Sequence, residues 1–246
     1  MEKTLVINNL GNNRAYEEVW AIQEGLLSQK VKQKTDTQQE HNIGEQNPQV
    51  FPDQLILVEH NPVYTLGKSG NISHVLISEE ERKEKGIEFF KINRGGDITF
   101  HGPGQLVGYP ILDLEHFKTD LGWYLRSLEE VIILTIEEYG VVGGRSKGET
   151  GVWIDADIPG SERKICAMGI KCSRWVTMHG FALNVNTNLD YFNYIVPCGI
   201  YNKQVTSLEK ELGYRVDMNE VTHKLLKNFE KVFEVKIVNS SEKGVN

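Results

Sequence analysis

The middle of the chain contains a series of short strand-like segments that are separated by only a few residues each. Connections of this length allow hairpins, whereas parallel neighbours need crossovers of about a dozen residues or more. The pattern therefore excludes a doubly wound parallel sheet and predicts an α+β fold with a mixed, largely antiparallel sheet flanked by helices. The strand patterns lie at residues 5–11, 54–60, 62–67, 87–92, 105–114, 151–155, 164–172 and 175–185.

Helical patterns are expected at the start, the centre and the end of the chain. Apolar residues recur at helical spacing from about Arg14 onward, and an amphipathic stretch at about 120–139 has Asp120 as its cap. A last helix is expected at about 217–233, and residues 78–86 form a charged helix or turn. Because no internal repeat or linker divides the sequence, we expect a single domain.

The charge of the chain limits the classes of partner. Its formal net charge is −7, from 27 lysines and arginines against 34 aspartates and glutamates. A general nucleic-acid binder needs a basic surplus because phosphate neutralisation supplies most of its affinity, so nucleic acid is not an expected partner. One basic stretch, residues 163–176, lacks acidic residues and contains Arg163, Lys164, Lys171 and Arg174. It is either a solvated strand face or a patch that guides an acidic partner.

The chain has three cysteines, Cys166, Cys172 and Cys198. An odd number in a chain of this length does not match the disulfide framework of a small secreted domain. The start has no apolar stretch of signal-peptide length, and the longest strongly apolar run, at 131–136, is far shorter than the roughly 18 residues of a membrane span. We therefore expect a reduced, soluble, cytoplasmic protein without a membrane partner.

Two short motifs match known patterns but lack the context that those patterns require. GRSKG (144–148) matches a nucleophile elbow, which needs a strand before Ser146 and a helix after it, whereas the order expected here is the reverse. GKS (67–69) resembles the end of a phosphate-binding loop, but the first glycine of that motif would fall at Pro62. The seven histidines lack metal-ligand spacing. We therefore expect no serine nucleophile, no phosphate-binding loop and no metal.

The segment RGGDITFHGPGQLVGYP, residues 94–110, is the densest in residues that suit a binding site. Its glycines allow the backbone to approach a ligand closely and leave N–H groups unobstructed. Arg94 adds a planar fork of donors for an anion or a carbonyl group. A tight hairpin with an arginine at its mouth is the alternative explanation for the same residues.

Lys164 and Cys198 are the candidates for chemistry. Lys164 opens a strand of small and apolar residues, and if its ammonium points into an apolar cleft, desolvation would lower its pKa and make it useful as a base. Cys198 stands between a proline and a glycine, a pattern that predicts a turn, and a nearby ammonium would lower the pKa of its thiol. The alternatives are a solvated strand-end lysine and a buried apolar cysteine. Burial is the stronger expectation for Cys166 and Cys172.

Four segments, in this order along the chain, resemble the lipoyl(octanoyl) transferase family: RGGDITFHGPGQLVGYP, KICAMGIK, HGFALNVN and VPCGI. Members of that family are octanoyl-[acyl-carrier-protein]:protein N-octanoyltransferases, related to the biotin/lipoate protein ligase fold. The resemblance runs from about residue 54 to about 210 and is most specific at 94–105. It implies that residues 1–246 form a single octanoyltransferase catalytic domain with a biotin/lipoate ligase catalytic-domain-like fold.

The resemblance also implies a cysteine/lysine dyad. Cys198 is the nucleophile that holds an acyl thioester, Lys164 lowers the pKa of that thiol and relays protons, and His179 supports the site. Backbone amides near Gly169 and Gly180 are candidate oxyanion donors. An apolar acyl slot is expected from Phe100, Ile165, Met168 and Phe181. The substrate-binding residues that the resemblance implies are Arg94, Gly95, Gly96, Asp97, Ile98, Thr99, Phe100, His101, Ala167, Met168, Gly169, Gly180, Phe181 and Ala182.

The implied activity is the transfer of an octanoyl group from octanoyl-acyl carrier protein, through the Cys198 thioester, to a lysine of apo lipoyl domains, as the first step of protein lipoylation. The acceptors are lipoyl domains of 2-oxoacid dehydrogenase complexes and the glycine cleavage H protein. No cofactor and no ATP are expected, and the family usually acts as a monomer. An ATP-dependent lipoate protein ligase and a non-catalytic lipoyl-domain binder are the alternatives.

The sequence departs from the expected family pattern in two places. A polar stretch at about 30–52 and the segment DADIPGSE, residues 155–162, are longer than in that pattern. Both are predicted to be surface loops, the first after an elongated helix end. They bear on partner contacts or lid motion rather than on the chemistry.

Overall fold

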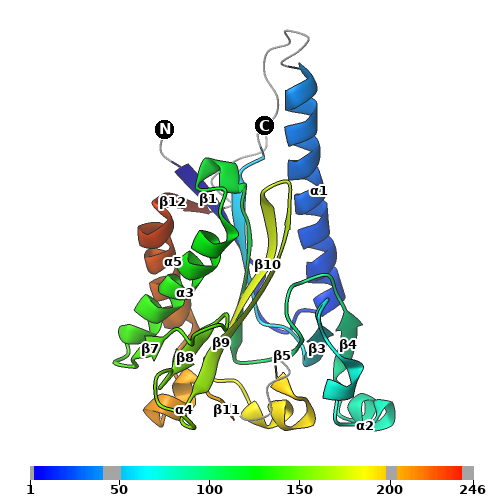
Figure 1. Ribbon diagram of the computed structural model, residues 1–246, viewed down its shortest axis with the longest axis vertical. Coiled ribbons are helices and arrows are strands. Elements are labelled where there is room, and N and C mark those ends of the chain that lie inside the picture. Colours follow the sequence, from blue (N-terminus) through cyan, green and yellow to red (C-terminus); the bar gives the residue numbers. More distant parts are fainter. Residues whose placement is uncertain (1–2, 41–50, 198–203, 240–246) are drawn as a thin grey trace.

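A nine-stranded mixed sheet forms the centre of the protein, whose computed structural model describes residues 3–40, 51–197 and 204–239 (Figure 1). The strand order is β12-β1-β2-β6-β10-β9-β8-β7, and β11 pairs with β9. Neighbours in the middle of the sheet are antiparallel, whereas β1 is parallel to both β2 and β12. The strands are β1 (Lys3–Asn9), β2 (Asp53–Val58), β6 (Gln105–Ile111), β7 (Gly143–Gly144), β8 (Val152–Ile154), β9 (Arg163–Ser173), β10 (Val176–Asn184), β11 (Gln204–Val205) and β12 (Val235–Asn239).

A second, three-stranded sheet lies beside the first. It consists of β3 (Val63–Leu66), β4 (Glu88–Lys91) and β5 (Ile98–His101) in the order β4-β3-β5. Figure 1 shows it at the lower right, near the start of α1 (Tyr16–Glu40). The expected α+β fold with a mixed sheet is therefore confirmed. The sequence pattern did not show that the strands divide into two sheets.

Helices cover both faces of the large sheet. Figure 1 shows α3 (Leu121–Glu137) and α5 (Met218–Phe233) together on one side and α1 along the other. The alternation of side chains in β2 explains this arrangement, because successive residues of a strand point to opposite faces. Leu55 and Leu57 belong to the core under α3 and α5, whereas Ile56 and Val58 pack in a second cluster with Val19 of α1. The short helices are α2 (Glu79–Glu84) and α4 (Leu208–Leu212).

The helix ends agree with the predicted signals. The Asp120 side chain accepts a hydrogen bond from Trp123 N at 2.9 Å, and Asp217 caps α5 by accepting from Asn219 N at 2.8 Å. A cap of this kind satisfies an N–H group that has no partner inside the helix and stabilises the helix by about 1 kcal/mol. Within the described ranges, no helix combines the length and the apolar composition that a membrane span needs.

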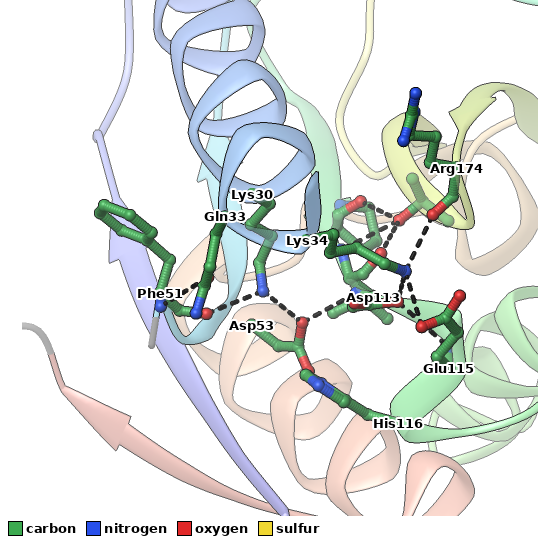
Figure 2. A network of polar contacts seen from close by, with 12 residues as sticks. Lys30, Gln33, Lys34, Phe51, Asp53, Asp113, Glu115, His116 and Arg174 are labelled. Carbon is green, nitrogen blue, oxygen red and sulfur yellow. Dashed lines mark hydrogen bonds and ion pairs between the residues drawn. The ribbon is translucent and has the colours of Figure 1, made fainter. Parts of the chain in front are cut away.

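The polar stretch after Ser28 is expected to be an elongated helix end followed by a surface loop, and its first part is helical. Residues 30–40 continue α1, and residues 41–50 lie outside the described part of the chain. The polar side chains of this helical segment are used in a lysine–carboxylate network, which consists of Lys30, Lys34, Asp53, Asp113, Glu115 and His116 (Figure 2). DADIPGSE is a series of mostly exposed turns between β8 and β9, as expected.

The network fixes α1 to three other segments of the chain. Lys30 Nζ lies 2.8 Å from Asp53 Oδ1 at the start of β2, and both side chains are buried. Lys34 Nζ lies 2.7 Å from Asp113 Oδ1, beyond the end of β6, and donates to the carbonyl of Arg174 in the β9–β10 turn. Figure 2 shows these groups converging from separate elements. The polar residues of this part of the helix form ion pairs with the rest of the fold, beside the apolar contacts of Val31.

Candidate active site

A cavity of about 320 Å³ lies between the β9–β10 hairpin and the segment that leads into β5. Strand residues from β9 and β10 form one wall, and the glycine-rich segment that starts at Arg94 forms the opposite wall. All the predicted substrate-binding residues except Phe100 line it, namely Arg94, Gly95, Gly96, Asp97, Ile98, Thr99, His101, Ala167, Met168, Gly169, Gly180, Phe181 and Ala182. Segments that are far apart in the sequence therefore meet at one concave surface.

Glycines bring the two walls close together. Gly95 N donates to Ile170 O at 2.9 Å, and a Cβ atom on Gly169 would lie 2.6 Å from Gly95 O. A Cβ atom on Gly180 would lie 2.2 Å from Gly108 O, so this position excludes a larger residue as well. Gly169 and Gly180, which were predicted as candidate oxyanion positions, are therefore also positions where the packing leaves no room for a side chain.

The GKS segment (67–69) supports the glycine-rich wall from behind. Lys68 N donates to Arg94 O at 2.9 Å, and Gly67 N donates to Asp97 O at 3.1 Å. Only the short 3-10 turn Ile72–His74 follows, rather than the helix that a phosphate-binding loop needs. The segment therefore has a structural use, in agreement with the predicted absence of a phosphate-binding loop.

Arg94 holds this wall in place. Its side chain is buried, and Nη2 donates to Thr65 O at 2.6 Å while Nη1 donates to Gly95 O at 3.0 Å. Asp97 also stabilises the wall. His74 Nδ1 lies 2.5 Å from Asp97 Oδ2, and the other carboxylate oxygen of Asp97 accepts from Ile98 N at 2.7 Å. Both charged side chains thus make contacts that fix the backbone around the cavity.

Two of the four residues expected in the acyl slot lie elsewhere. Phe100 is buried on the opposite face of β5, where its ring stacks on Tyr191 with the centroids 4.5 Å apart. Ile165 belongs to the main core. Strand alternation explains the placement of Phe100, because its neighbours Thr99 and His101 face the cavity and Phe100 must then face away. Met168 and Phe181 do line the cavity.

Lys164 lies inside the cavity rather than at a solvated strand end. Its side chain is buried, and its ammonium lies 4.5 Å from the centroid of the Trp153 ring. Its backbone is held by β11, because Val205 is its register partner and Thr206 N donates to Lys164 O at 3.0 Å. A buried lysine facing a partly apolar cavity is the arrangement in which an amine can exchange protons with a bound group.

Cys198 lies outside the described residues, but both flanks of residues 198–203 are described. Pro197 lines a small pocket together with Lys164, Ala182 and Asn184. On the other side, β11 pairs directly with the β9 residues Arg163 and Lys164. The segments on both sides of residues 198–203 therefore lie next to Lys164.

The other two cysteines have the burial that the sequence predicted. Cys166 is fully buried, and burial raises the pKa of its thiol well above the usual range. Cys172 is half-buried, and burial raises its pKa as well. Neither side chain lines the cavity. Both environments disfavour the thiolate form that a nucleophile needs.

The inner end of the cavity is built from aromatic and imidazole groups, several of which the sequence did not indicate. Tyr16 of α1 and Tyr109 of β6 line it beside His101 and His179. Burial lowers the pKa of His101 well below its usual value and the pKa of His179 to about 3, and the nearby Arg94 guanidinium adds to both effects. The imidazoles are therefore neutral. Tyr16 gave no sequence signal because it fits an ordinary helical pattern.

Half of the positive charges in the basic stretch 163–176 are compensated by ion pairs in the fold. Arg163 forms ion pairs with Asp155 and with Glu211, whose Oε2 lies 2.7 Å from Arg163 Nη2. Lys171 Nζ lies 3.0 Å from Glu24 Oε1 of α1. Acidic residues that are distant in the sequence thus compensate two of the four charges. The patch is a poorer guide for an acidic partner than its sequence suggested.

The structure also shows the surroundings of Ser146 and of the potential metal ligands. Ser146 follows the two-residue strand β7 and leads through a turn to β8, so no helix follows it as a nucleophile elbow requires. Among the residues that the structure describes, no group of three or more His, Cys, Asp or Glu side chains is arranged to hold a metal ion.

Comparisons with known proteins agree with this architecture. The family model of the lipoyl protein ligase A/B catalytic domain matches residues 15–230. An octanoyltransferase of Christiangramia forsetii is 53% identical over 238 residues, which cover 96% of this chain and 99% of that protein. An octanoyltransferase of Flavobacterium psychrophilum is 52% identical over 239 residues, which cover 97% of this chain and all of that protein.

Solved structures with the same fold are more distant in sequence. A bipartite lipoate protein ligase of Thermoplasma acidophilum has a TM-score of 0.67 at 17% identity, and the match covers 98% of this chain and 87% of that one. A lipoate-protein ligase A bound with ATP has a TM-score of 0.64 at 14% identity, covering 99% and 92%. The chain belongs to the lipoyl protein ligase A/B catalytic-domain family and, within it, to the octanoyltransferases.

Proposed function

We propose that this chain transfers an octanoyl group from octanoyl-acyl carrier protein to a lysine of apo lipoyl domains, through a thioester on Cys198 and without ATP. The observation that carries the proposal is the position of Lys164. Its buried side chain lines the cavity, and the two segments that flank residues 198–203 lie beside it. Relatives that are about half identical over nearly the whole chain are named octanoyltransferases, which supports the same activity.

The first step forms an acyl-enzyme. The thiolate of Cys198 attacks the thioester carbonyl of the octanoyl-carrier, so that one C–S bond forms and the bond to the carrier's pantetheine sulfur breaks. A thiolate leaves, and Lys164 gives it a proton. The energies of the two thioesters are similar, so this exchange needs no activation by ATP.

The second step forms a stable amide. The amine of the acceptor lysine attacks the octanoyl-Cys198 thioester, a C–N bond forms, and the C–S bond to Cys198 breaks. Lys164, now neutral, accepts a proton from the attacking amine, and the pair returns to ammonium and thiolate. The same lysine thus acts as an acid in the first step and as a base in the second.

The walls of the cavity near Lys164 suit a saturated chain. Ala167 and Ala182 are small, and Met168 and Phe181 add apolar surface further along the hairpin. Small side chains beside the reacting group leave room for the thioester, and the apolar ones receive the chain. The single domain over residues 1–246, a monomeric state, a cytoplasmic location and the acceptors named above are part of the same proposal.

The test is a transfer reaction with purified octanoyl-acyl carrier protein and apo lipoyl domain, with and without ATP, followed by intact mass. We expect one octanoyl group on the lipoyl domain in both conditions, no product with Cys198→Ala, and normal product with the matched control Cys166→Ala. Strict dependence on ATP would indicate the ligase alternative. Binding of the lipoyl domain without any turnover would indicate the non-catalytic binder.

A further inference from the structure

A hollow on the surface of the protein adjoins the glycine-rich wall of the cavity. Its volume is about 630 Å³, and its lining comes from the end of β3, the turn after it and the end of β4. The backbone connects it to the wall, because Lys68 N donates to Arg94 O at 2.9 Å and Ser69 N donates to Gly96 O at 3.3 Å. The residues that line the hollow include two lysines and no acidic residue, so its charge is positive.

The two lysines of the hollow are Lys68 and Lys91. Both are exposed, and neither forms an ion pair with any residue that the structure describes. The sheet brings them together, since Lys91 is the register partner of Leu66, two residues before Lys68. By contrast, Arg163 and Lys171 of the basic stretch are compensated by carboxylates. The hollow is therefore a better guide for an acidic partner than the basic stretch.

Apolar side chains are exposed beside this positive charge. Ile72 is 55% exposed and Leu76 is 57% exposed. Ile72 lines both the hollow and a second one of about 430 Å³, where Phe89 adds apolar surface and the charges of Glu79 and Arg82 balance. Exposed apolar groups with charges at their margin are typical of a surface that binds another protein.

The segment that leaves the hollow runs to the chain just before Cys198. Asn71 lines the hollow, and His74, three residues later, accepts at its carbonyl from Val196 N at 2.8 Å. Three residues of chain span at most about 10 Å. A partner bound at the hollow would therefore lie beside the approach to Cys198 and not on the reacting group itself.

We propose that the surface formed by Lys68, Ile72, Leu76 and Lys91 docks the acyl carrier protein that delivers the octanoyl group. The inference rests on the proposed acyl transfer. Acyl carrier proteins are acidic, and they hold the acyl group at the end of a long phosphopantetheine arm. The two lysines match that charge, and the exposed apolar pair provides contact area. The arm allows the thioester to reach Cys198 from a carrier bound at this distance, whereas a lipoyl domain presents its acceptor on a much shorter lysine side chain.

The first test measures the binding of octanoyl-acyl carrier protein to enzyme that carries Cys198→Ala, so that no transfer occurs, at low and high salt. Lys68→Glu with Lys91→Glu should weaken binding at low salt about tenfold and flatten its dependence on salt, because like charges then face each other. Lys32→Glu with Lys227→Glu is the matched control, since it changes the net charge equally at exposed positions outside both hollows and the cavity. Unchanged binding in the first pair, or an equal loss in the control, would overturn the inference.

The apolar part of the surface is tested in the same binding measurement. Ile72→Ser should weaken binding about fivefold at both salt concentrations, because the lost contact is apolar. Val142→Ser is the control, at a side chain that is 81% exposed and lines neither hollow. Equal affinity of the two variants would remove Ile72 from the docking surface.

The second test compares acyl-enzyme formation from octanoyl-acyl carrier protein and from octanoyl-pantetheine, a thioester without the protein. In Lys68→Glu with Lys91→Glu, KM for the carrier should rise about tenfold, while the rate with octanoyl-pantetheine and KM for the lipoyl domain stay as in wild type. A loss with both donors would indicate damage to the cavity, and a rise in KM for the lipoyl domain alone would indicate that the acceptor docks here. Either result would overturn the inference. If the wild-type enzyme forms no acyl-enzyme, the proposed transfer fails, and the binding measurements still decide where the carrier docks.

Discussion

Two regions of the β9–β10 hairpin use polar residues in opposite ways. At the turn, Arg174 and the lysine–carboxylate network form a set of groups that satisfy one another, as Figure 2 shows. At the cavity, His179 is buried just as deeply but its ring has no partner among the described residues. Burial of polar groups is therefore not itself a sign of function. A polar group that the protein leaves unpaired toward a cavity is the better indicator.

The two regions also differ in what holds them together. The network joins α1 to the sheet by buried ion pairs, which are sensitive to the loss of either partner. The cavity is held by backbone contacts at glycines, which are sensitive to added atoms. Substitutions in the network should therefore change stability alone, whereas substitutions in the cavity should change catalysis, with or without a change in stability.

The largest effect is expected at Lys164. Lys164→Gln removes the group that exchanges protons in both steps, so kcat/KM for octanoyl transfer should fall by about 10²–10⁴ with the fold unchanged by circular dichroism. Lys171→Gln is the matched control, because Lys171 is on the same strand but pairs with Glu24 outside the cavity. A loss of less than threefold in Lys164→Gln would remove this lysine from the mechanism.

The next effect is expected in the network. Lys30→Met leaves the buried carboxylate of Asp53 without its ammonium partner, so the free energy of unfolding should fall by about 3–5 kcal/mol. Activity per folded molecule should stay the same, because Lys30 is not among the residues that line the cavity. Urea unfolding measures the change, with the exposed Lys32→Met on the same helix as the control. Equal stability of the two variants would contradict the role of the ion pair.

A smaller loss of stability is expected at the cavity wall. In Gly169→Ala the new methyl group would meet Gly95 O at 2.6 Å, so the walls must separate and unfolding should become easier by about 1–3 kcal/mol, with reduced transfer. Gly144→Ala is the control, because the nearest atom there is at an ordinary 3.5 Å. Thermal and urea unfolding of both variants test the difference. A fully stable and active Gly169→Ala would show that the wall can move at no cost.

The smallest effect depends on pH. The hydrogen bond with Asp53 raises the pKa of His116. The stability that this bond adds to the folded state is therefore present below about pH 6.5 and is lost as the pH rises through the higher folded-state pKa. Burial favours the protonated form of Asp53, but the hydrogen bonds from His116 and Lys30 outweigh it and lower the pKa. That contribution is present above about pH 4 and is lost as the pH falls through the lower folded-state value.

The two dependences define a window for the variant His116→Asn. It should be less stable than wild type between about pH 4 and 6.5, by less than about 1 kcal/mol because His116 is half-exposed, and the difference should vanish as the pH rises past the raised folded-state pKa of His116. Unfolding in urea at several pH values measures it. A difference that grows toward pH 8 would have the wrong sign for this pair.

Local patterns predicted much of the fold. The Asp120 cap, the strands of the hairpin and the residues around Arg94 follow from spacing and glycine content, which are properties of short segments. Pairing partners were not predictable in the same way. The sequence around Arg163 gave no sign that Glu211 would neutralise it, because the two residues are 48 positions apart.

The same limit applies to the site. Phe100 belongs to the segment that lines the cavity, yet its side chain faces the opposite side. The pairing register of a strand decides which of its alternating residues face the cavity, and this register is not visible in the sequence. The polar composition after Ser28 indicated an elongated helix end, but it did not show that Lys30 and Lys34 would attach this helix to the rest of the fold through ion pairs. The left-handed backbone of His179 has no signature in the sequence at all.

The acyl-enzyme itself is the most direct test of the central claim, which is that Cys198 holds the octanoyl group beside Lys164. The enzyme is incubated with octanoyl-acyl carrier protein in the absence of a lipoyl domain, and intact mass and peptide mapping locate the adduct. We predict one octanoyl group, on the peptide that contains Cys198, in wild type, Cys166→Ala and Cys172→Ala, and none in Cys198→Ala. An octanoyl group that remains in Cys198→Ala, or that maps to another residue in wild type, would contradict the account.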